Sequence, residues 1–186
     1  MTDFFISFRK LIIGVVCVGI AQLSLAQSPA TQLETALNAR GAIVKYEVFS
    51  LDNLPAFRMD AMKVTNVETF AIAQGVKVLK KVSEGKKTKT VYTYIDRTEI
   101  EGLLTSLAYI KTIVKSNIIP GNFTAVQYAT VDGFQVTLQT GLNPTTGKLE
   151  WRFSVQTKIS EDKTFVQLEM ADIDKLQKLL EQAKSK

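Results

Sequence analysis

The residues VYTYIDRTEIEGLLTSLAYI, from Val91 to Ile110, decide the fold. A run of β-branched and aromatic residues, 88–95, leads directly into a segment whose apolar residues recur with the 3.6-residue period of an α-helix. The apolar stripe of that segment consists of Ile100, Leu103, Leu104, Leu107 and Val114. The pattern predicts a strand that continues into an amphipathic helix over residues 97–116.

Acidic residues stand at the start of this helix. Asp96 and Glu99 have the spacing of a capping box, in which each side chain accepts a hydrogen bond from the backbone of the other residue. Together with Glu101 they offer two other interpretations, a paired-carboxylate acid/base site and a calcium site. We favour capping, because carboxylates are also stabilised by the positive end of the helix dipole.

Strand-like runs lie on both sides of the predicted helix. Four precede it, at residues 42–51, 56–65, 67–82 and 88–95, with a possible break near Gly75 in the third. Four follow it, at residues 123–131, 133–140, 148–157 and 163–170, and a second amphipathic helix over 172–183 closes the chain. Apolar and polar residues alternate in the later strands, which is typical of an antiparallel sheet with one face on the core. The sequence predicts an α+β fold, with antiparallel sheet of about eight strands backed by two amphipathic helices.

The two halves of the chain resemble each other when they are aligned 73 positions apart. Ile100 then falls on Ile173 and Leu103 on Leu176, and the acidic group recurs as Glu169, Asp172 and Asp174. We therefore expect a single domain, 27–186, in which residues 41–119 and 120–186 are two similar ββββα halves. A capped amphipathic helix after a strand also arises by chance, so duplication and coincidence both remain open.

Residues 1–26 have the three zones of a secretory signal peptide. Arg9 and Lys10 supply the positive charge, an uncharged apolar run extends from Leu11 to Ala21, and small residues precede a cleavage site after Ala26. A membrane anchor is the alternative, but the apolar run is short for one. Export to the periplasm or the cell exterior is the expectation, with a short helix or partly ordered arm at residues 28–40 and no transmembrane segment after cleavage.

Composition excludes several kinds of chemistry. The chain has no histidine and one cysteine, Cys17, which lies in the predicted signal peptide. A mature chain without imidazole or thiol lacks the groups of Ser-His-Asp and Cys-His catalysis and of the usual zinc sites. The formal net charge of +5 falls to +4 without the leader, which is too mild to suggest a nucleic-acid partner. The sequence predicts no cofactor, no metal ligand and no catalytic residue.

Lysines gather around the turn at Glu84 and Gly85. A hairpin there would bring several of them together, and five are candidate ligand-binding residues: Lys80, Lys81, Lys86, Lys87 and Lys89. Lys77 lies in the same run. Such a cluster can bind a polyanion, for example an acidic glycan. The alternative is a solvated hairpin whose lysines prevent edge-to-edge strand pairing.

Aromatic residues are the remaining candidates, because their rings can stack on sugars. The five considered are Tyr92, Tyr94, Tyr109, Tyr128 and Trp151. Trp151 lies on the apolar side of its strand, which favours core packing with a hydrogen bond from the indole N–H. Tyr92 and Tyr94 share a strand face that is expected to continue into Ile100 and Leu103, at the core or its rim.

The stretch from Tyr94 to Leu107 resembles the Tyr-x-Asp-x-x-Glu-Ile-x-x-Leu-Leu-x-x-Leu pattern of small exported bacterial proteins that carry no assigned activity. The match rests on Tyr94, Asp96, Glu99, Ile100, Leu103, Leu104 and Leu107. The resemblance implies export and transfers no catalytic residues. The leading hypothesis is a non-catalytic binding module of the bacterial cell envelope, whose partner is an anionic glycan or a protein. The alternatives are a carboxylate-dependent hydrolase of an envelope polymer and a calcium-stabilised structural module.

Overall fold

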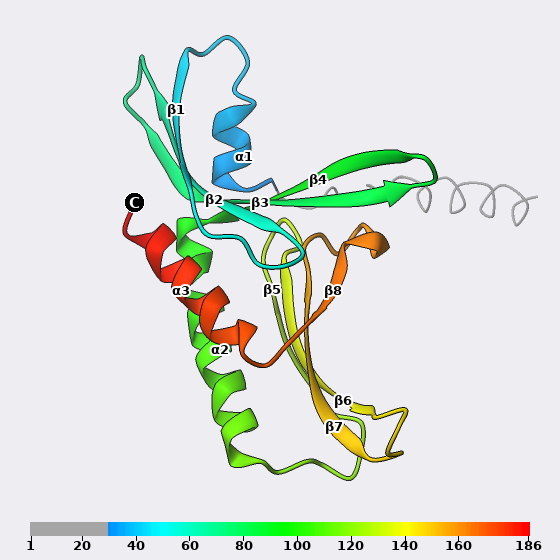
Figure 1. Cartoon of the computed structure of the whole chain (residues 1–186). Coiled ribbons are helices and arrows are strands. Elements are labelled where there is room, and N and C mark those ends of the chain that lie inside the picture. The colour runs from blue at the N-terminus through cyan, green and yellow to red at the C-terminus, as the bar shows by residue number, and fades with distance from the viewer. Residues whose placement is uncertain (1–29) are drawn as a thin grey trace, which may run out of the picture.

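The computed structural model describes residues 30–186, and the predicted signal peptide lies outside them. After a short helix, α1 (Gln32–Leu37), the first half consists of β1 (Val44–Ser50), β2 (Arg58–Asn66), β3 (Ile72–Glu84), β4 (Lys87–Asp96) and α2 (Arg97–Ser116). The second half consists of β5 (Ala125–Ala129), β6 (Gln135–Leu142), β7 (Leu149–Gln156), the 3₁₀ turn η1 (Asp162–Thr164), β8 (Phe165–Leu168) and α3 (Asp172–Lys184). The predicted α+β class and its ββββα order are confirmed (Figure 1).

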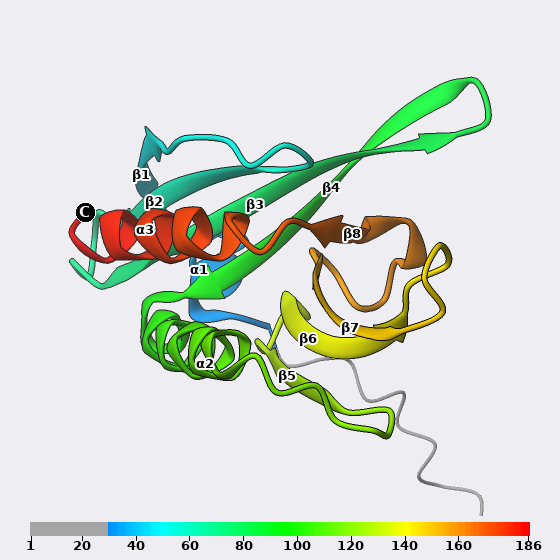
Figure 2. The same cartoon turned by 60° about the horizontal axis from the view of Figure 1, so that its bottom comes forward.

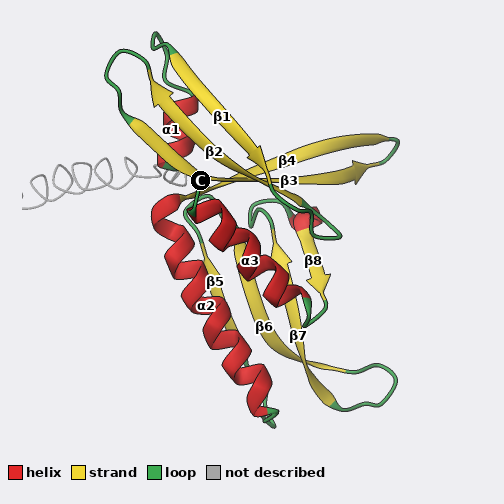
Figure 3. Ribbon diagram, turned by 60° about the vertical axis from the view of Figure 1, so that its left-hand side comes forward, coloured by secondary structure: helices red, strands yellow, loops and turns green. Residues whose placement is uncertain are grey.

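Each half forms its own antiparallel sheet of four strands, in the order β1-β2-β3-β4 and β5-β6-β7-β8. Helices α2 and α3 lie side by side against these sheets (Figure 3). Within each sheet, every strand pairs with its neighbour along the chain, so neither sheet contains a crossover connection. The third predicted strand differs from the structure, since β3 begins at Ile72 and runs through Gly75 without a break.

The helix starts repeat between the halves. The backbone N–H of Asp96 donates to the Glu99 carboxylate at 3.0 Å, and the backbone N–H of Glu169 donates to the Asp172 carboxylate at 3.1 Å. These two pairs are separated by the 73 positions of the sequence alignment. One hydrogen bond thus recurs at matched positions, but the junctions differ, because α2 begins directly after Asp96 whereas α3 begins three residues after Glu169, at Asp172.

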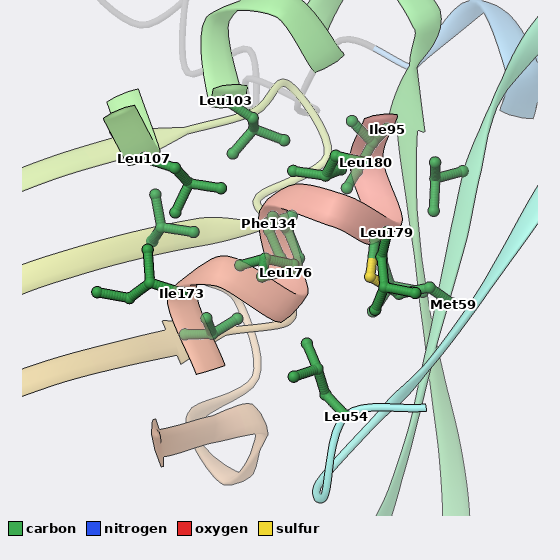
Figure 4. Packing of buried hydrophobic residues seen from close by; sticks show 14 of the residues in the cluster. Leu54, Met59, Ile95, Leu103, Leu107, Phe134, Ile173, Leu176, Leu179 and Leu180 are labelled. Carbon is green, nitrogen blue, oxygen red and sulfur yellow. The ribbon is translucent and has the colours of Figure 1, made fainter. Parts of the chain in front are cut away.

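The main core contains residues from both halves and from both long helices. Met59, Ile95, Phe134, Leu176 and Leu179 are among its buried members. Figure 4 shows Leu179 beside Met59 of β2 and Leu176 beside Phe134, which precedes β6. Helix α3 therefore fills the space between the two sheets, and burial of its apolar stripe couples the halves.

A second, smaller core lies on the opposite face of the first sheet, beneath α1. Leu33 of α1 is completely buried there against Met62 and Val64 of β2 and Ala73 of β3. Helix α1 is too short to be stable alone, so packing of Leu33 must hold it in place. The first sheet is consequently covered on one face by the main core and on part of the other face by α1.

The β2–β3 and β6–β7 connections have the same hydrogen-bond pattern. Asn66 and Asn143 each accept from the backbone N–H groups two and three residues later. Four residues after each asparagine, the chain adopts a positive φ, at Phe70 (59°) and at Gly147 (65°). Glycine tolerates this conformation, whereas a residue with a Cβ is strained in it. Phe70 is also 78% exposed, so its ring gains little from burial.

Replacing Phe70 by glycine is therefore expected to raise the free energy of unfolding by about 0.5–1 kcal/mol. The reciprocal change, Gly147→Phe, places a Cβ in the same left-handed position and should lower stability by about 1–2 kcal/mol. Chemical denaturation of the two variants provides the measurement. Destabilisation by Phe70→Gly would mean that the phenylalanine ring makes a stabilising contact that outweighs the strain.

Candidate functional site: the outer face of the β3–β4 hairpin

The β3–β4 hairpin extends beyond the rest of the first sheet. Pairing between β2 and β3 ends with Arg58 opposite Leu79, whereas β3 and β4 remain paired as far as Glu84 and Lys87. Gly85 has a positive φ of 62° and Lys86 does not, which are the signs of a type II′ hairpin turn. The result is a two-stranded ribbon that projects from the molecule (Figure 2).

The structure divides the five predicted ligand-binding lysines between the two faces of this ribbon. Strand alternation places Lys81 on the outer face, which is also the face that α1 covers further along the sheet. Lys80 and Lys89 lie on the inner face, toward the second half. Lys87 is two residues from Lys89 on β4 and therefore lies on the same face. Lys86 occupies the turn. Lys77, from the same run, joins Lys81 on the outer face.

Two of the inner-face lysines, Lys80 and Lys89, make contacts within the protein. Lys80 Nζ lies 3.5 Å from the carbonyl oxygen of Ala56, and burial lowers the pKa of Lys80. Lys89 Nζ donates to the Glu161 carboxylate at 2.9 Å, and this hydrogen bond raises the pKa of Lys89. Lys89 thereby links the ribbon to the η1 turn of the second half. These contacts compete with any ligand for the two ammonium groups.

The outer face has a groove of about 490 Å³. The connection between β1 and β2 forms one wall and the β3–β4 hairpin forms the other. The groove is lined by Asn53, Leu54, Pro55, Ala56, Phe57, Arg58, Leu79, Lys81, Thr90 and Tyr92. This lining contains two cationic side chains, one tyrosine and no carboxylate, so it presents hydrogen-bond donors beside an aromatic surface.

Two cations, Arg58 in the groove lining and Lys77 beside it, are held in place by other side chains. The Arg58 guanidinium donates to Asp60 at 2.8 Å and to the Ser50 hydroxyl at 2.9 Å. Lys77 Nζ lies 4.2 Å from the centre of the Tyr92 ring, within the range of a cation–π interaction. Both contacts restrict long side chains that would otherwise lose conformational entropy on binding a ligand.

The two tyrosines of β4 share a face as expected, but that face does not continue into Ile100 and Leu103, and the expected core position is wrong for Tyr92. Tyr92 is 43% exposed beside the groove, and Tyr94 packs partly against the small core beneath α1. It is Ile95 that joins Ile100 and Leu103 in the main core. The strand ends at Asp96, and the odd-numbered residues of β4 face the core while the tyrosines face outward. Burial raises the pKa of the Tyr94 phenol, and the carboxylates of Glu34 and Asp132 add to this increase.

The other aromatic candidates do not join Tyr92 at the groove. Trp151 is half-buried at the edge of the main core, and its indole N–H donates to the carbonyl oxygen of Ile118 at 3.0 Å. Tyr128 of β5 packs over Gly102 of α2. Tyr109 is exposed on α2. The five rings therefore do not form a single stacking platform.

The acidic residues at the helix starts serve structural contacts. Asp96 and Glu99 form the predicted capping box of α2, and the Glu99 carboxylate also accepts from the backbone N–H of Val131 at 2.6 Å. Glu101 pairs with Lys184 at 2.6 Å and Asp174 with Lys111 at 2.5 Å, so these two carboxylates join α2 to α3. Within residues 30–186, no group of three or more His, Cys, Asp or Glu side chains is placed to hold a metal ion.

A second groove, of about 380 Å³, lies between α1 and the adjoining ends of β1, β2 and β3. Its lining is mainly apolar and contains five alanines besides Val44 and Ile72. It has no charged side chain, so sequence reasoning based on charge and aromatic residues could not have found it. Contacts between α1 and the sheet create this groove, and those contacts are remote in sequence.

Comparisons with protein-family models, with curated proteins and with solved structures gave no match. Among residues 30–186, no helix is both long enough and apolar enough to cross a membrane. The function is therefore inferred from the chemistry of this chain's own surfaces, and the outer groove combines the cations Arg58 and Lys81 with the exposed ring of Tyr92.

Proposed function

We propose that the protein is a non-catalytic binding module of the bacterial cell envelope and that it binds an anionic glycan in the outer groove of the β3–β4 hairpin. The observation that carries this proposal is the groove lining, in which Arg58, ion-paired with Asp60, and Lys81 lie beside Tyr92 and no lining residue is itself a carboxylate. The cations suit the acidic groups of a glycan, and the tyrosine ring suits the apolar face of a sugar. The signal-peptide pattern of residues 1–26 supports an envelope location.

The proposal retains only some of the predicted lysines as ligand-binding residues. Lys81 is the predicted lysine that lines the groove, and Lys77 extends the positive charge along the same face. Lys86, in the exposed turn, can meet a long polymer at the end of the ribbon. Lys80 and Lys89 are left to their contacts with Ala56 and Glu161.

Two double variants test this proposal, because the hairpin carries lysines on both faces. Lys77→Gln with Lys81→Gln removes two charges from the outer face. We expect binding to an acidic polysaccharide such as polygalacturonate to weaken by about tenfold or more, since each lysine near an anionic surface contributes about 1 kcal/mol. Isothermal titration calorimetry at low and moderate salt provides the measurement, with neutral dextran as the ligand control.

The matched control is Lys87→Gln with Lys89→Gln, which removes the same charge from the inner face of the same ribbon. Binding by this variant should stay within a few-fold of the wild type. If both double variants lose affinity equally, the polymer responds to net charge and the groove has no special role. Failure of the wild-type chain to bind any acidic polysaccharide would overturn the proposal itself.

A further inference from the structure

Strand β1 leaves one edge of the first sheet open. Among the described strands, β1 pairs with β2 alone. It contains no proline, and its exposed apolar side chains include Tyr46 (62% exposed) and Val48 (47%), with Ile43 (64%) immediately before the strand. Edges of this kind pair with further strands unless proline, a bulge, a covering segment or unmatched charges prevent it. The two charged residues of β1, Lys45 and Glu47, therefore decide which partner the edge accepts.

The hydrogen-bond pattern shows which residues of β1 offer their backbone to the open edge. Val67 N–H donates to Ile43 at one end of the strand, and Leu51 N–H donates to Met59 at the other. The odd-numbered residues between Ile43 and Leu51 therefore bond toward β2, because hydrogen-bonded positions alternate in an antiparallel ladder. The even-numbered residues Val44, Tyr46 and Val48 direct their N–H and C=O groups outward.

The sequence of β1 is complementary to itself about Tyr46. An antiparallel copy centred there sets Val44 opposite Val48 and Ile43 opposite Phe49. It also sets Lys45 opposite Glu47, twice, once on each side of the symmetry axis. Tyr46 then lies opposite Tyr46 of the second copy. The backbone N–H and C=O groups of Tyr46 point toward the open edge, so the two residues can exchange hydrogen bonds. The backbone and the side chains therefore favour the same register.

Neighbouring registers are less favourable. A copy centred on Glu47 sets the two Glu47 carboxylates directly opposite each other, and one centred on Lys45 does the same with two ammonium groups. A copy centred on Val48 sets Glu47 opposite Phe49, so the Glu47 carboxylate has no cationic partner in the other chain. Like charges that face each other across a strand pair destabilise it, so charge selects the Tyr46 register.

We propose that β1 is the interface for a second copy of this chain, which adds to the first sheet edge to edge about a two-fold axis through Tyr46. The two first sheets then form one continuous eight-stranded sheet, with about six new backbone hydrogen bonds between the two β1 strands. The partner is a second copy because the Lys45–Glu47 pairing and the apolar pairing are both satisfied by the same seven residues. This interface does not include the residues of the outer groove, so it stands independently of glycan binding.

Charge exchange provides the test. Lys45→Glu and Glu47→Lys, made separately, each turn two attractive pairs of the symmetric interface into repulsive ones. We expect each variant to dimerise about tenfold or more weakly than the wild type, as measured by sedimentation equilibrium of the full chain. Mixing the two variants should restore a dimer, because each chain then supplies the charges that the other lacks. The double exchange, Lys45→Glu with Glu47→Lys, should dimerise as the wild type does.

The double exchange also separates dimerisation from folding. Within one chain, Glu47 forms an ion pair with Lys45 at 3.3 Å and lies opposite Lys63 of β2. Each single exchange breaks the Lys45–Glu47 pair within the chain, and the double exchange restores it. The Glu47→Lys change also sets two positive charges opposite each other at Lys63. The double exchange keeps that unfavourable neighbour and yet restores the complementary pairs between chains. A wild-type chain that remains monomeric at its solubility limit would overturn the proposal. So would single variants that dimerise as tightly as the wild type, or a mixture that stays monomeric.

Discussion

Replacing Asp96 by alanine is expected to lower the free energy of unfolding by about 2–4 kcal/mol, because this carboxylate caps two helices at once and its hydrogen bonds involve a charged acceptor. At α2 it takes part in the capping box with Glu99. At α1 its two oxygens accept from the backbone N–H groups of Gln32, at 2.7 Å, and Leu33, at 2.9 Å. Asp96 is 7% exposed, so water cannot easily replace it.

The loss should be concentrated at α1. That helix has six residues and depends on Leu33, which is completely buried in the small core. Without the Asp96 carboxylate, the N–H groups of Gln32 and Leu33 lose their acceptor, and the helix can detach from the sheet. Amide hydrogen exchange should therefore increase over residues 31–37 more than over α2, and urea denaturation measures the global change.

Glu169→Ala is the matched control, because Glu169 occupies the equivalent position in the second half and is exposed. Its backbone N–H, which the substitution retains, makes the contact with Asp172. This variant should be within about 0.5 kcal/mol of the wild type. Equal, small effects of the two substitutions would show that Asp96 does not join α1 to the sheet.

Local patterns accounted for much of the fold. The helix predicted over residues 97–116 has those bounds in α2, since its cap, its apolar stripe and its termination at Asn117 are all encoded within a few turns. Asn117 adopts a left-handed conformation with a φ of 53°. The contacts of Asp96 with α1 could not be predicted in this way, because they join residues more than 60 positions apart.

The candidate site was predicted less well. A run of lysines indicated a charged hairpin, but Lys80 and Lys81 lie on opposite faces of the strand. This separation could have been predicted from the sequence, because neighbouring strand residues always alternate between faces. The groove itself requires the connection between β1 and β2 to pack beside β3 and β4. No local pattern in residues 51–57 indicates that packing, so the lining around Tyr92 emerged from the structure alone.

The Gly75→Ala variant is expected to lose about 2–4 kcal/mol of stability, within the range of other severe steric changes in cores. A Cβ at Gly75 would lie 2.1 Å from the carbonyl oxygen of Ile95 on the neighbouring strand. The obstacle is backbone and not the end of a flexible side chain, so the β3–β4 ladder must shift. Since β4 leads directly into α2 through Asp96, the shift also strains the capping of both helices.

Gly121→Ala provides the comparison for this substitution. Gly121 lies between α2 and β5, and a Cβ there meets nothing within 4 Å. Alanine at that position should be neutral or stabilise the protein slightly, because it restricts the unfolded chain. Equilibrium denaturation of both variants tests the argument. If Gly75→Ala is as stable as Gly121→Ala, β3 and β4 do not approach each other closely enough at position 75 to exclude a Cβ. The close approach would then not be the reason for a glycine within β3.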